Sequence, residues 1–200
     1  MEKAKKSKKW WWIGGILFVL FVIGVFAPSE ETTTKSKEVQ STEIPASQQA
    51  FINAVTSIMA DYEKASNELK KSAVRKTRRQ KIRAALKEKR KVVNWVGTLK
   101  DMSTTSERNA YVSIQPEGSN FFIQTWNNEV SDFMDKTLIP ESSTLYNAVA
   151  DLDKGNKVIF SGSFVQSDDD FVGEQSMTEQ GSMLDPEFSF RFSEIKDYNQ

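Results

Sequence analysis

The longest uncharged run of the chain lies near its N-terminus, at residues 10–27, and is almost wholly apolar. A helix rises 1.5 Å per residue, so these residues would span about 27 Å, close to the hydrocarbon thickness of a bilayer. Lysines precede the run, and Trp10, Trp11 and Trp12 open it, as residues of the headgroup region do. The pattern predicts one transmembrane helix over residues 10–27, with the lipid bilayer as a partner.

A cleaved signal peptide is the alternative interpretation of this run. The only small-residue cleavage site ends at Ala27, and Pro28 follows it directly, which would obstruct the peptidase. Five lysines precede the run, whereas only Lys35 and Lys37 soon follow it. The positive-inside rule then predicts residues 1–9 as a basic cytoplasmic tip. The remainder would be periplasmic or extracellular, in a single-pass protein of the cell inner membrane.

Residues 28–46 are rich in Ser, Thr and Glu and contain few apolar side chains, so we expect a flexible linker. Residues 47–91 then read as a helical stalk, with Ser47 as the expected N-cap. Its first half carries an apolar stripe at spacings of four and three: Phe51, Val55, Ile58, Tyr62, Ala65 and Leu69. This stripe would pack on the C-terminal domain or a neighbouring helix, or would self-associate as a coiled coil.

The second half of the predicted stalk is strongly basic, because Glu88 is its only acid between Lys70 and Lys91. A solvated face, or pairing with the acidic C-terminal third, is one interpretation. Contact with an anionic membrane surface is another, and its candidate residues are Arg75, Arg78, Arg79 and Arg83. Nucleic acid is an unlikely partner here, since an exported helix meets little of it.

From residue 92 the period of the apolar positions changes to two, which predicts strands at 92–99, 110–115, 121–126, 156–165 and around residue 190. The first strand would place Val93, Trp95, Gly97 and Leu99 on one face. The last strand is the clearest, because Phe188, Phe190 and Phe192 alternate with polar residues. A short helix capped by Ser142 or Ser143, ending before Gly155, separates the third strand from the fourth.

Three strands, one helix and two strands are the element order of an OB-fold, a five-stranded barrel with a helix between strands three and four. Gly97 and Gly162 fall within strands, where a closed barrel needs residues that permit sharp bends. The predicted class is therefore α+β, comprising a transmembrane helix, a helical stalk and an OB-like barrel over residues 92–198.

Three segments of this region, NWVGTL, LDKGNKVIFSGSF and PEFSFRFSEI, carry a family resemblance. They resemble the tRNA-anticodon-binding-like OB-fold group of mostly uncharacterised bacterial envelope and prophage-associated proteins. The resemblance covers about residues 92–198 and implies the barrel fold. It implies neither tRNA binding nor any catalytic residue.

The chain has no cysteine and no histidine. This composition excludes disulfides, thiol nucleophiles, Ser-His-Asp triads and most zinc sites. We therefore expect no cofactor and no enzyme. A carboxylate enzyme is a minor alternative, with Asp132 and Glu174 as its arbitrary candidates. The acidic run at residues 168–170 lacks the spacing of a calcium loop and is expected at a hairpin tip.

An OB barrel binds ligands on the face of its second and third strands and the adjoining loops. Here that region supplies Tyr111, Phe122, Trp126, Asn127, Asn128 and Asp132. A planar or sugar-like ligand would stack on Trp126, unless that ring covers the barrel end.

The sequence thus favours a membrane-anchored protein whose OB-like domain binds an envelope protein or a small ligand. Two alternatives belong to other classes. A nucleic-acid-binding module would use the basic helix if the C-terminal part were cytoplasmic, and a structural spacer would self-associate through its stalk.

Overall fold

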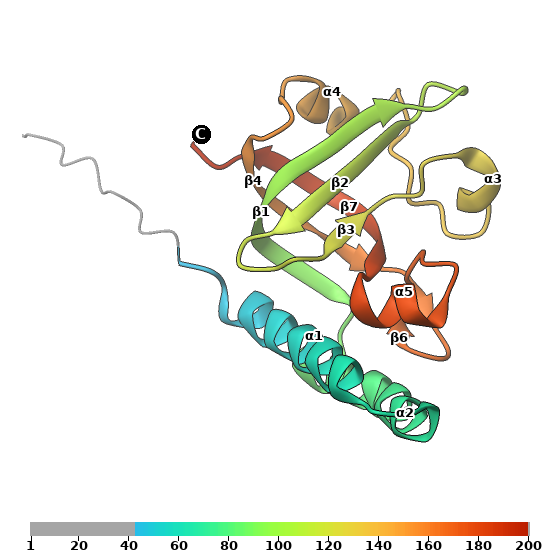
Figure 1. Ribbon diagram of the computed structural model, residues 1–200. Helices are drawn as coiled ribbons and strands as arrows, with labels where there is room; N and C mark the ends of the chain where they lie inside the picture. Colours follow the sequence, from blue (N-terminus) through green and yellow to red (C-terminus); the bar gives the residue numbers. More distant parts are fainter. Residues whose placement is uncertain (1–42, 200) are drawn as a thin grey trace, which may run out of the picture. The chain divides into compact units, whose positions relative to one another are not determined.

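The computed structural model describes residues 43–199 (Figure 1). The predicted cytoplasmic tip, the anchor at residues 10–27 with its three tryptophans, and most of the predicted linker lie outside this range. Within residues 43–199, no helix combines the length and apolar character needed to cross a bilayer.

Five strands close into a mixed barrel, in the order β1-β2-β3-β7-β4. They are β1 (Lys91–Thr104), β2 (Ala110–Pro116), β3 (Phe122–Gln124), β4 (Lys157–Phe164) and β7 (Glu187–Asp197). All neighbours are antiparallel except β3 and β7, which run parallel. The predicted α+β class and five-stranded closed barrel are confirmed, and the arrangement is consistent with an OB-like fold.

Closure depends on β1, which pairs along its first half with β4 and along its second half with β2. The two pairings overlap at Gly97, which pairs with Pro116 of β2 and with Val158 of β4. A Cβ added at Gly97 would lie 2.6 Å from the carbonyl oxygen of Gln115. Gly162 in β4 is equally constrained, because its Cβ would overlap the Arg191 carbonyl and the Phe190 ring. Both glycines thus permit close approach between strands of the closed barrel, whereas the sequence prediction assigned them to sharp bends.

The alternation predicted for the first strand is wrong at Val93, which is 56% exposed. The pairing of β1 with β4 shifts register between Val92 and Trp95, and Asn94 has a φ of +55°. This bulge places the extra residue outside and moves Val92 into the core. The phenylalanines at 188, 190 and 192 are buried, as their alternation predicts.

The helical stalk predicted over residues 47–91 is two helices, α1 (Ala46–Lys64) and α2 (Glu68–Ala85), which end before β1 begins at Lys91. Asn67 caps α2 by accepting a hydrogen bond from the Lys70 N–H. Ser47 does not cap α1; its hydroxyl accepts a 3.0 Å hydrogen bond from the Trp95 indole. The two helices pack side by side (Figure 1).

The apolar stripe of α1 covers one end of the barrel (Figure 1). The Phe51 ring lies with its centroid 5.0–5.8 Å from four aromatic rings of the barrel: Trp95, Phe121, Phe164 and Phe188. Aromatic packing of this kind adds to the stabilisation from burial. Two of the arrangements that the sequence leaves open are observed together, because α1 packs on the C-terminal domain and on the neighbouring helix α2, and α1 thus shares the barrel core.

Shorter elements fill the two long connections. Between β3 and β4 lie α3 (Glu129–Asp132) and α4 (Thr144–Ala150), and α4 is the predicted helix, capped by the Ser143 hydroxyl. Between β4 and β7 lie a two-stranded hairpin, β5 (Gln166–Ser167) and β6 (Phe171–Val172), and then α5 (Glu179–Leu184). The tip of the β5–β6 hairpin lies at residues 168–170, where the sequence predicts one, whereas α3 and α5 have no counterpart in the sequence prediction.

Candidate interaction surfaces

An exposed apolar surface lies on α3 and the turn after it. Val130, Phe133 and Met134 are 89%, 76% and 80% exposed. Residues spaced by three and four lie on the same face of a helical turn, so the three side chains adjoin one another. We call this set the α3 apolar surface. Figure 1 shows α3 beside the barrel, away from the α1–α2 pair.

The opposite side of α3 is polar and is held by Asp132. Its buried carboxylate accepts hydrogen bonds of 2.6 Å from both the N–H and the hydroxyl of Thr137, and one of 3.1 Å from the Leu138 N–H. Asn128 caps the helix by accepting a bond from the Ser131 N–H. The turn is therefore inverted relative to an ordinary amphipathic helix, because its polar side faces inward and its apolar side faces solvent.

Trp126 strengthens this arrangement. Its indole donates a 2.7 Å hydrogen bond to the Asp135 carboxylate, and its backbone N–H donates one of 2.7 Å to the Thr137 hydroxyl. Arg191 in β7 donates to the Asp135 backbone carbonyl, which joins the segment to the barrel. The α3 apolar surface thus stands on a hydrogen-bonded platform.

The structure therefore separates the six residues predicted as a ligand face. Trp126, Asn128 and Asp132 are engaged within the α3 segment, and Asn127 is exposed beside them. Tyr111 and Phe122 lie instead on the outer face of the barrel, half-buried. No common pocket for a planar ligand forms from these six among the residues that the structure describes.

The outer face around Tyr111 carries a polar network that the sequence did not reveal. Gln124 is its centre: it accepts hydrogen bonds from the Tyr111 and Ser113 hydroxyls and donates to Gln175 and Glu187. Alternation along β3, with Ile123 inside, was the signal that Gln124 faces outward. The network joins β2, β3 and β7 across the surface of the sheet.

Burial raises the pKa of the Tyr111 hydroxyl. Burial also raises the pKa of the Glu187 carboxyl group, and the nearby Asp185 carboxylate is the second cause of that shift. Glu187 thus binds its proton more readily than an ordinary carboxyl group does. Within residues 43–199, no group of three carboxylates is arranged to hold a metal ion. This face presents hydrogen-bonding side chains.

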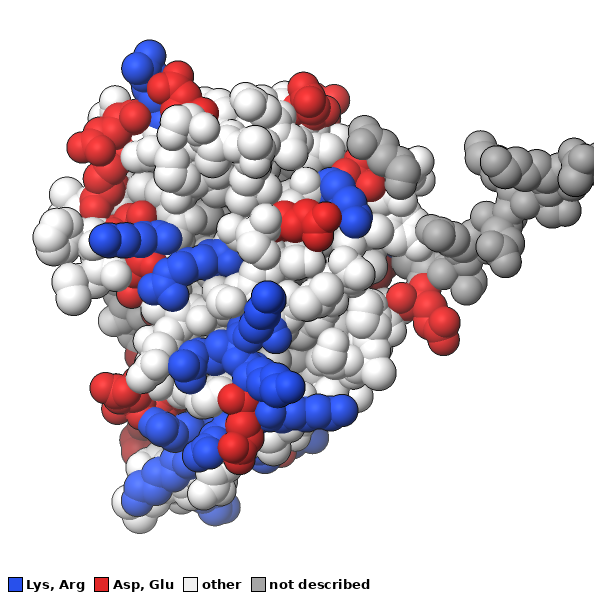
Figure 2. Space-filling model, turned by 180° about the vertical axis from the view of Figure 1, so that it is seen from behind, with Lys and Arg blue, Asp and Glu red and all other residues white. Residues whose placement is uncertain are grey.

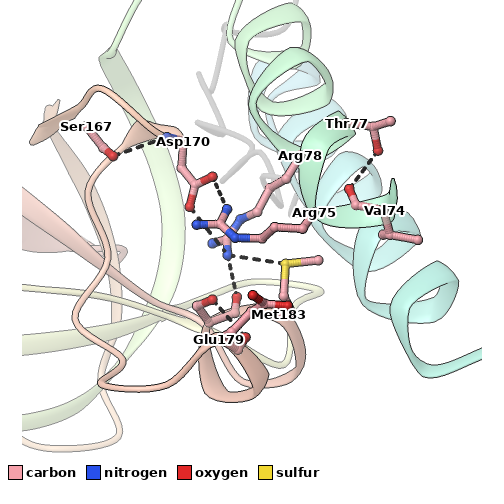
Figure 3. A network of polar contacts seen from close by, with 9 residues as sticks. Val74, Arg75, Thr77, Arg78, Ser167, Asp170, Glu179 and Met183 are labelled. Atoms are coloured by element: carbon pink, nitrogen blue, oxygen red, sulfur yellow. Dashed lines mark hydrogen bonds and ion pairs between the residues drawn. The ribbon is translucent and has the colours of Figure 1, made fainter. Parts of the chain in front are cut away.

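Two of the four arginines predicted to meet an anionic surface point inward instead (Figure 3). Arg78 is 2% exposed; its guanidinium donates a 2.7 Å hydrogen bond to the Ser182 carbonyl and lies 3.7 Å from the Asp170 carboxylate. Arg75 forms an ion pair with the same carboxylate. Burial lowers the pKa of Arg78. These two residues join α2 to the β4–β7 connection; Arg78 is withdrawn from the surface, and Arg75 is only partly exposed.

Other basic residues of this region remain at the surface. They gather on one face of the molecule, over α2 and the turn into β1 (Figure 2). We call this set the basic face: Lys76, Arg79, Arg83, Lys87, Lys89 and Lys91. Of the original four candidates, Arg79 and Arg83 belong to it.

A cavity of about 300 Å³ lies between α4, the C-terminal end of β1 and the N-terminal end of β2. Its walls are mostly apolar and come from Met102, Ser103, Thr104, Ala110, Tyr146, Val149 and Ala150. This volume is at the lower limit for a small-molecule site, and few polar groups converge on it.

The two carboxylates considered for catalysis each have partners close in sequence. Asp132 accepts hydrogen bonds from Thr137 and Leu138, whereas Glu174 accepts one from the Ser176 N–H. No family model, curated protein or solved structure matches the chain.

Proposed function

We propose that this chain is a membrane-anchored, non-enzymatic binding module that recognises a protein partner of the cell envelope through the α3 apolar surface. The observation that carries the proposal is the exposure of Val130, Phe133 and Met134 on one face of a turn fixed from behind by Asp132.

Burial of these side chains in a partner would supply a sizeable part of a binding free energy. Transfer of a Val, Phe or Met side chain from water to an apolar contact contributes about 1.5–3 kcal/mol. Aromatic residues and methionine are also enriched in protein interfaces. Because hydrogen bonds already fix the turn, little backbone entropy is lost on binding.

The surroundings favour a protein over a lipid surface. Glu129 adjoins the apolar side chains, and hydrogen bonds, the Thr105 hydroxyl first among them, lower the pKa of its carboxyl group. Glu129 is thus charged at neutral pH and would repel anionic headgroups. A partner with an apolar pocket bordered by basic or hydrogen-bonding groups fits this surface.

The anchor in this proposal rests on the sequence of residues 10–27 and on the lysines that precede it. A topology reporter fused after Gln200 tests the placement, since the export that we expect gives periplasmic-type activity. Cytoplasmic-type activity would overturn the envelope partner and would favour the alternative nucleic-acid-binding module.

Site-specific photo-crosslinking tests the surface itself. A photoreactive phenylalanine analogue replaces Phe133 in the full chain, expressed in its native host, and cross-linked products are identified by mass spectrometry. The matched control carries the analogue at Asn147, an exposed position on α4. We expect one discrete partner at position 133 and none at position 147.

A double substitution tests whether the cross-link from position 133 depends on the α3 apolar surface. Val130→Ser together with Met134→Ser leaves Asp132 in place and should abolish the cross-link from position 133. The proposal fails if this pair leaves the product unchanged, or if the product is a dimer of the chain itself.

A further inference from the structure

We infer that the basic face lies against the anionic headgroups of the bilayer that holds the chain, and so orients the barrel on the membrane. This inference rests on the anchor in the proposed function. It extends that proposal by assigning a second surface, with a lipid phosphate layer as its partner.

The first observation is the uneven distribution of charge around α2. On its inner side, cations are matched by acids: Arg75 and Arg78 by Asp170, and Lys81 by Asp61 at 2.7 Å. Residues 76, 79 and 83 lie on another side of the helix, at spacings of three and four. The helix therefore separates neutralised cations from exposed ones.

The second observation is the scarcity of acids in the segment that supplies the basic face. Between Lys70 and Lys91 the sequence has one acidic residue, Glu88, which pairs with Arg83 at 3.2 Å. Within residues 43–199, no ion pair joins Lys76, Arg79 or Lys89 to a carboxylate. A positive surface of this kind is complementary to an anionic leaflet.

The third observation is where the chain enters the described domain. The Trp95 indole donates to the Ser47 hydroxyl, and the Gln48 amide bonds to Val96, so the fifth and sixth residues of β1 lie beside the start of α1. The basic face ends at Lys91, at the first residue of β1. Lys91 thus lies on the same strand as the residues that contact the start of α1, four residues or about 13 Å before Trp95.

The predicted linker is short enough to keep this face near the bilayer. A flexible chain of its length has a root-mean-square span of about 25 Å. Contact with the leaflet then becomes an intramolecular step with a high effective concentration. Each cation near an anionic leaflet strengthens association about fivefold, and salt screens the effect.

Nucleic acid is the competing phosphate polymer. Proteins that bind single strands place aromatic side chains among the cations, so that bases stack on them. The segment that supplies the basic face has no aromatic residue from Ser72 to Asn94, so it offers no side chain on which a base could stack. Lipid phosphate, which needs charge but no stacking, fits better.

Vesicle co-sedimentation tests the inference. Residues 43–199 contain a closed barrel with a core of their own, so a fragment from residue 43 to 200 is suitable. Vesicles hold phosphatidylcholine alone or with about one-third phosphatidylglycerol. We expect binding to the anionic vesicles at low salt, loss of binding at high salt, and no binding to phosphatidylcholine.

Matched triple variants assign the effect to the surface. Lys76→Gln, Arg79→Gln and Lys89→Gln together should weaken partitioning about a hundredfold, at fivefold for each cation. The control combines Lys100→Gln, Lys136→Gln and Lys196→Gln, which are exposed elsewhere, and should stay within about twofold. Unchanged thermal unfolding verifies that both variants fold.

The inference is overturned by equal binding to both kinds of vesicle, by equal losses in the two triple variants, or by tighter binding to single- or double-stranded DNA at the same salt. The fragment lacks the predicted anchor, so these results are independent of the topology reporter and the Phe133 cross-link. In the full chain, reconstituted in nanodiscs, amine labelling of Lys76 and Lys89 should fall when phosphatidylglycerol replaces phosphatidylcholine.

Discussion

Gln48 in α1 and Val96 in β1 are joined by two hydrogen bonds of 2.7 Å each. The Gln48 side-chain amide donates to the Val96 carbonyl, while the Val96 N–H donates to the Gln48 amide oxygen. Pairing between β1 and β2 begins only at Gly97, so the side chain takes the place of a neighbouring strand. The buried amide thereby fastens the helix to the barrel wall.

Gln48→Ala should lower the free energy of unfolding by about 2 kcal/mol, because it leaves the buried Val96 N–H without a partner. Urea denaturation measures the change. Gln49→Ala is the control, since its side chain is exposed and bonds only to Asn53, and it should cost less than about 0.5 kcal/mol. Equal losses in the two variants would show that the amide does not fasten α1.

Gly162→Ala should destabilise the barrel by about 3 kcal/mol or more, because the added methyl group would overlap the Arg191 carbonyl and the Phe190 ring. Backbone on the neighbouring strand cannot move aside without breaking the pairing of β4 with β7. The thermal midpoint of unfolding measures the loss. Ser163→Ala, in the same strand, is the control; a similar midpoint for both variants would contradict close approach at Gly162.

The barrel was predictable because its strands carry strong local patterns. Phe188, Phe190 and Phe192 alternate with polar residues, and that alternation depends only on the period of a strand. Val93 was wrongly predicted on the buried face because a bulge changes the period within β1. No Gly or Pro at the bulged residues indicates the bulge. The hairpin tip at residues 168–170 was predicted, but the strands β5 and β6 beside it were not, because strands of two residues have no measurable period.

The candidate sites were less predictable, since they depend on partners distant in sequence. Arg78 and Arg79 are adjacent residues of the same type, so the sequence does not distinguish them. Arg78 is buried because it lies beside Asp170, which is distant in sequence. Asp132 was predicted at a ligand face but binds the backbone of its own loop. Its short distance in sequence from Thr137 was a signal that local capping competes with a ligand role.

Arg78→Met should lower the free energy of unfolding by about 3 kcal/mol, because it removes one of the two cations beside the buried Asp170 carboxylate and the donor to the Ser182 carbonyl. Arg79→Met is the matched control: it is the same substitution one residue away, at an exposed position, and should change stability by less than about 0.5 kcal/mol. Chemical denaturation distinguishes the two. A larger loss for Arg79→Met would contradict the inward network.

Glu187→Gln should stabilise the protein at pH 7, where the folded state must hold a carboxylate that favours its proton. Because the folded-state pKa is raised, the native protein is favoured at acid pH and loses stability as pH rises through the ordinary carboxyl pKa to the raised value. Glu187 is half-exposed and solvent screens it, so we expect a gain of about 0.3 kcal/mol.

The gain from Glu187→Gln should vanish near pH 3, well below the ordinary Glu pKa of about 4.3, where the carboxyl group is protonated in both states. Unfolding free energies at the two pH values test the sign, with Glu63→Gln on the surface of α1 as a control. A gain that grows on acidification would contradict the direction of the pKa shift.

Asp132→Ala should disorganise the α3 segment while leaving the three apolar side chains in the sequence. The Thr137 and Leu138 donors would lose their acceptor, at a cost of about 1–3 kcal/mol borne mainly by this segment. Hydrogen exchange should therefore rise over residues 126–138 and not in β4. Because partner binding needs a fixed turn, the cross-link from position 133 should weaken even though Val130 and Met134 remain. Faster exchange with an undiminished cross-link would mean that the apolar side chains bind the partner without a fixed turn, and would contradict a role for preorganisation in binding.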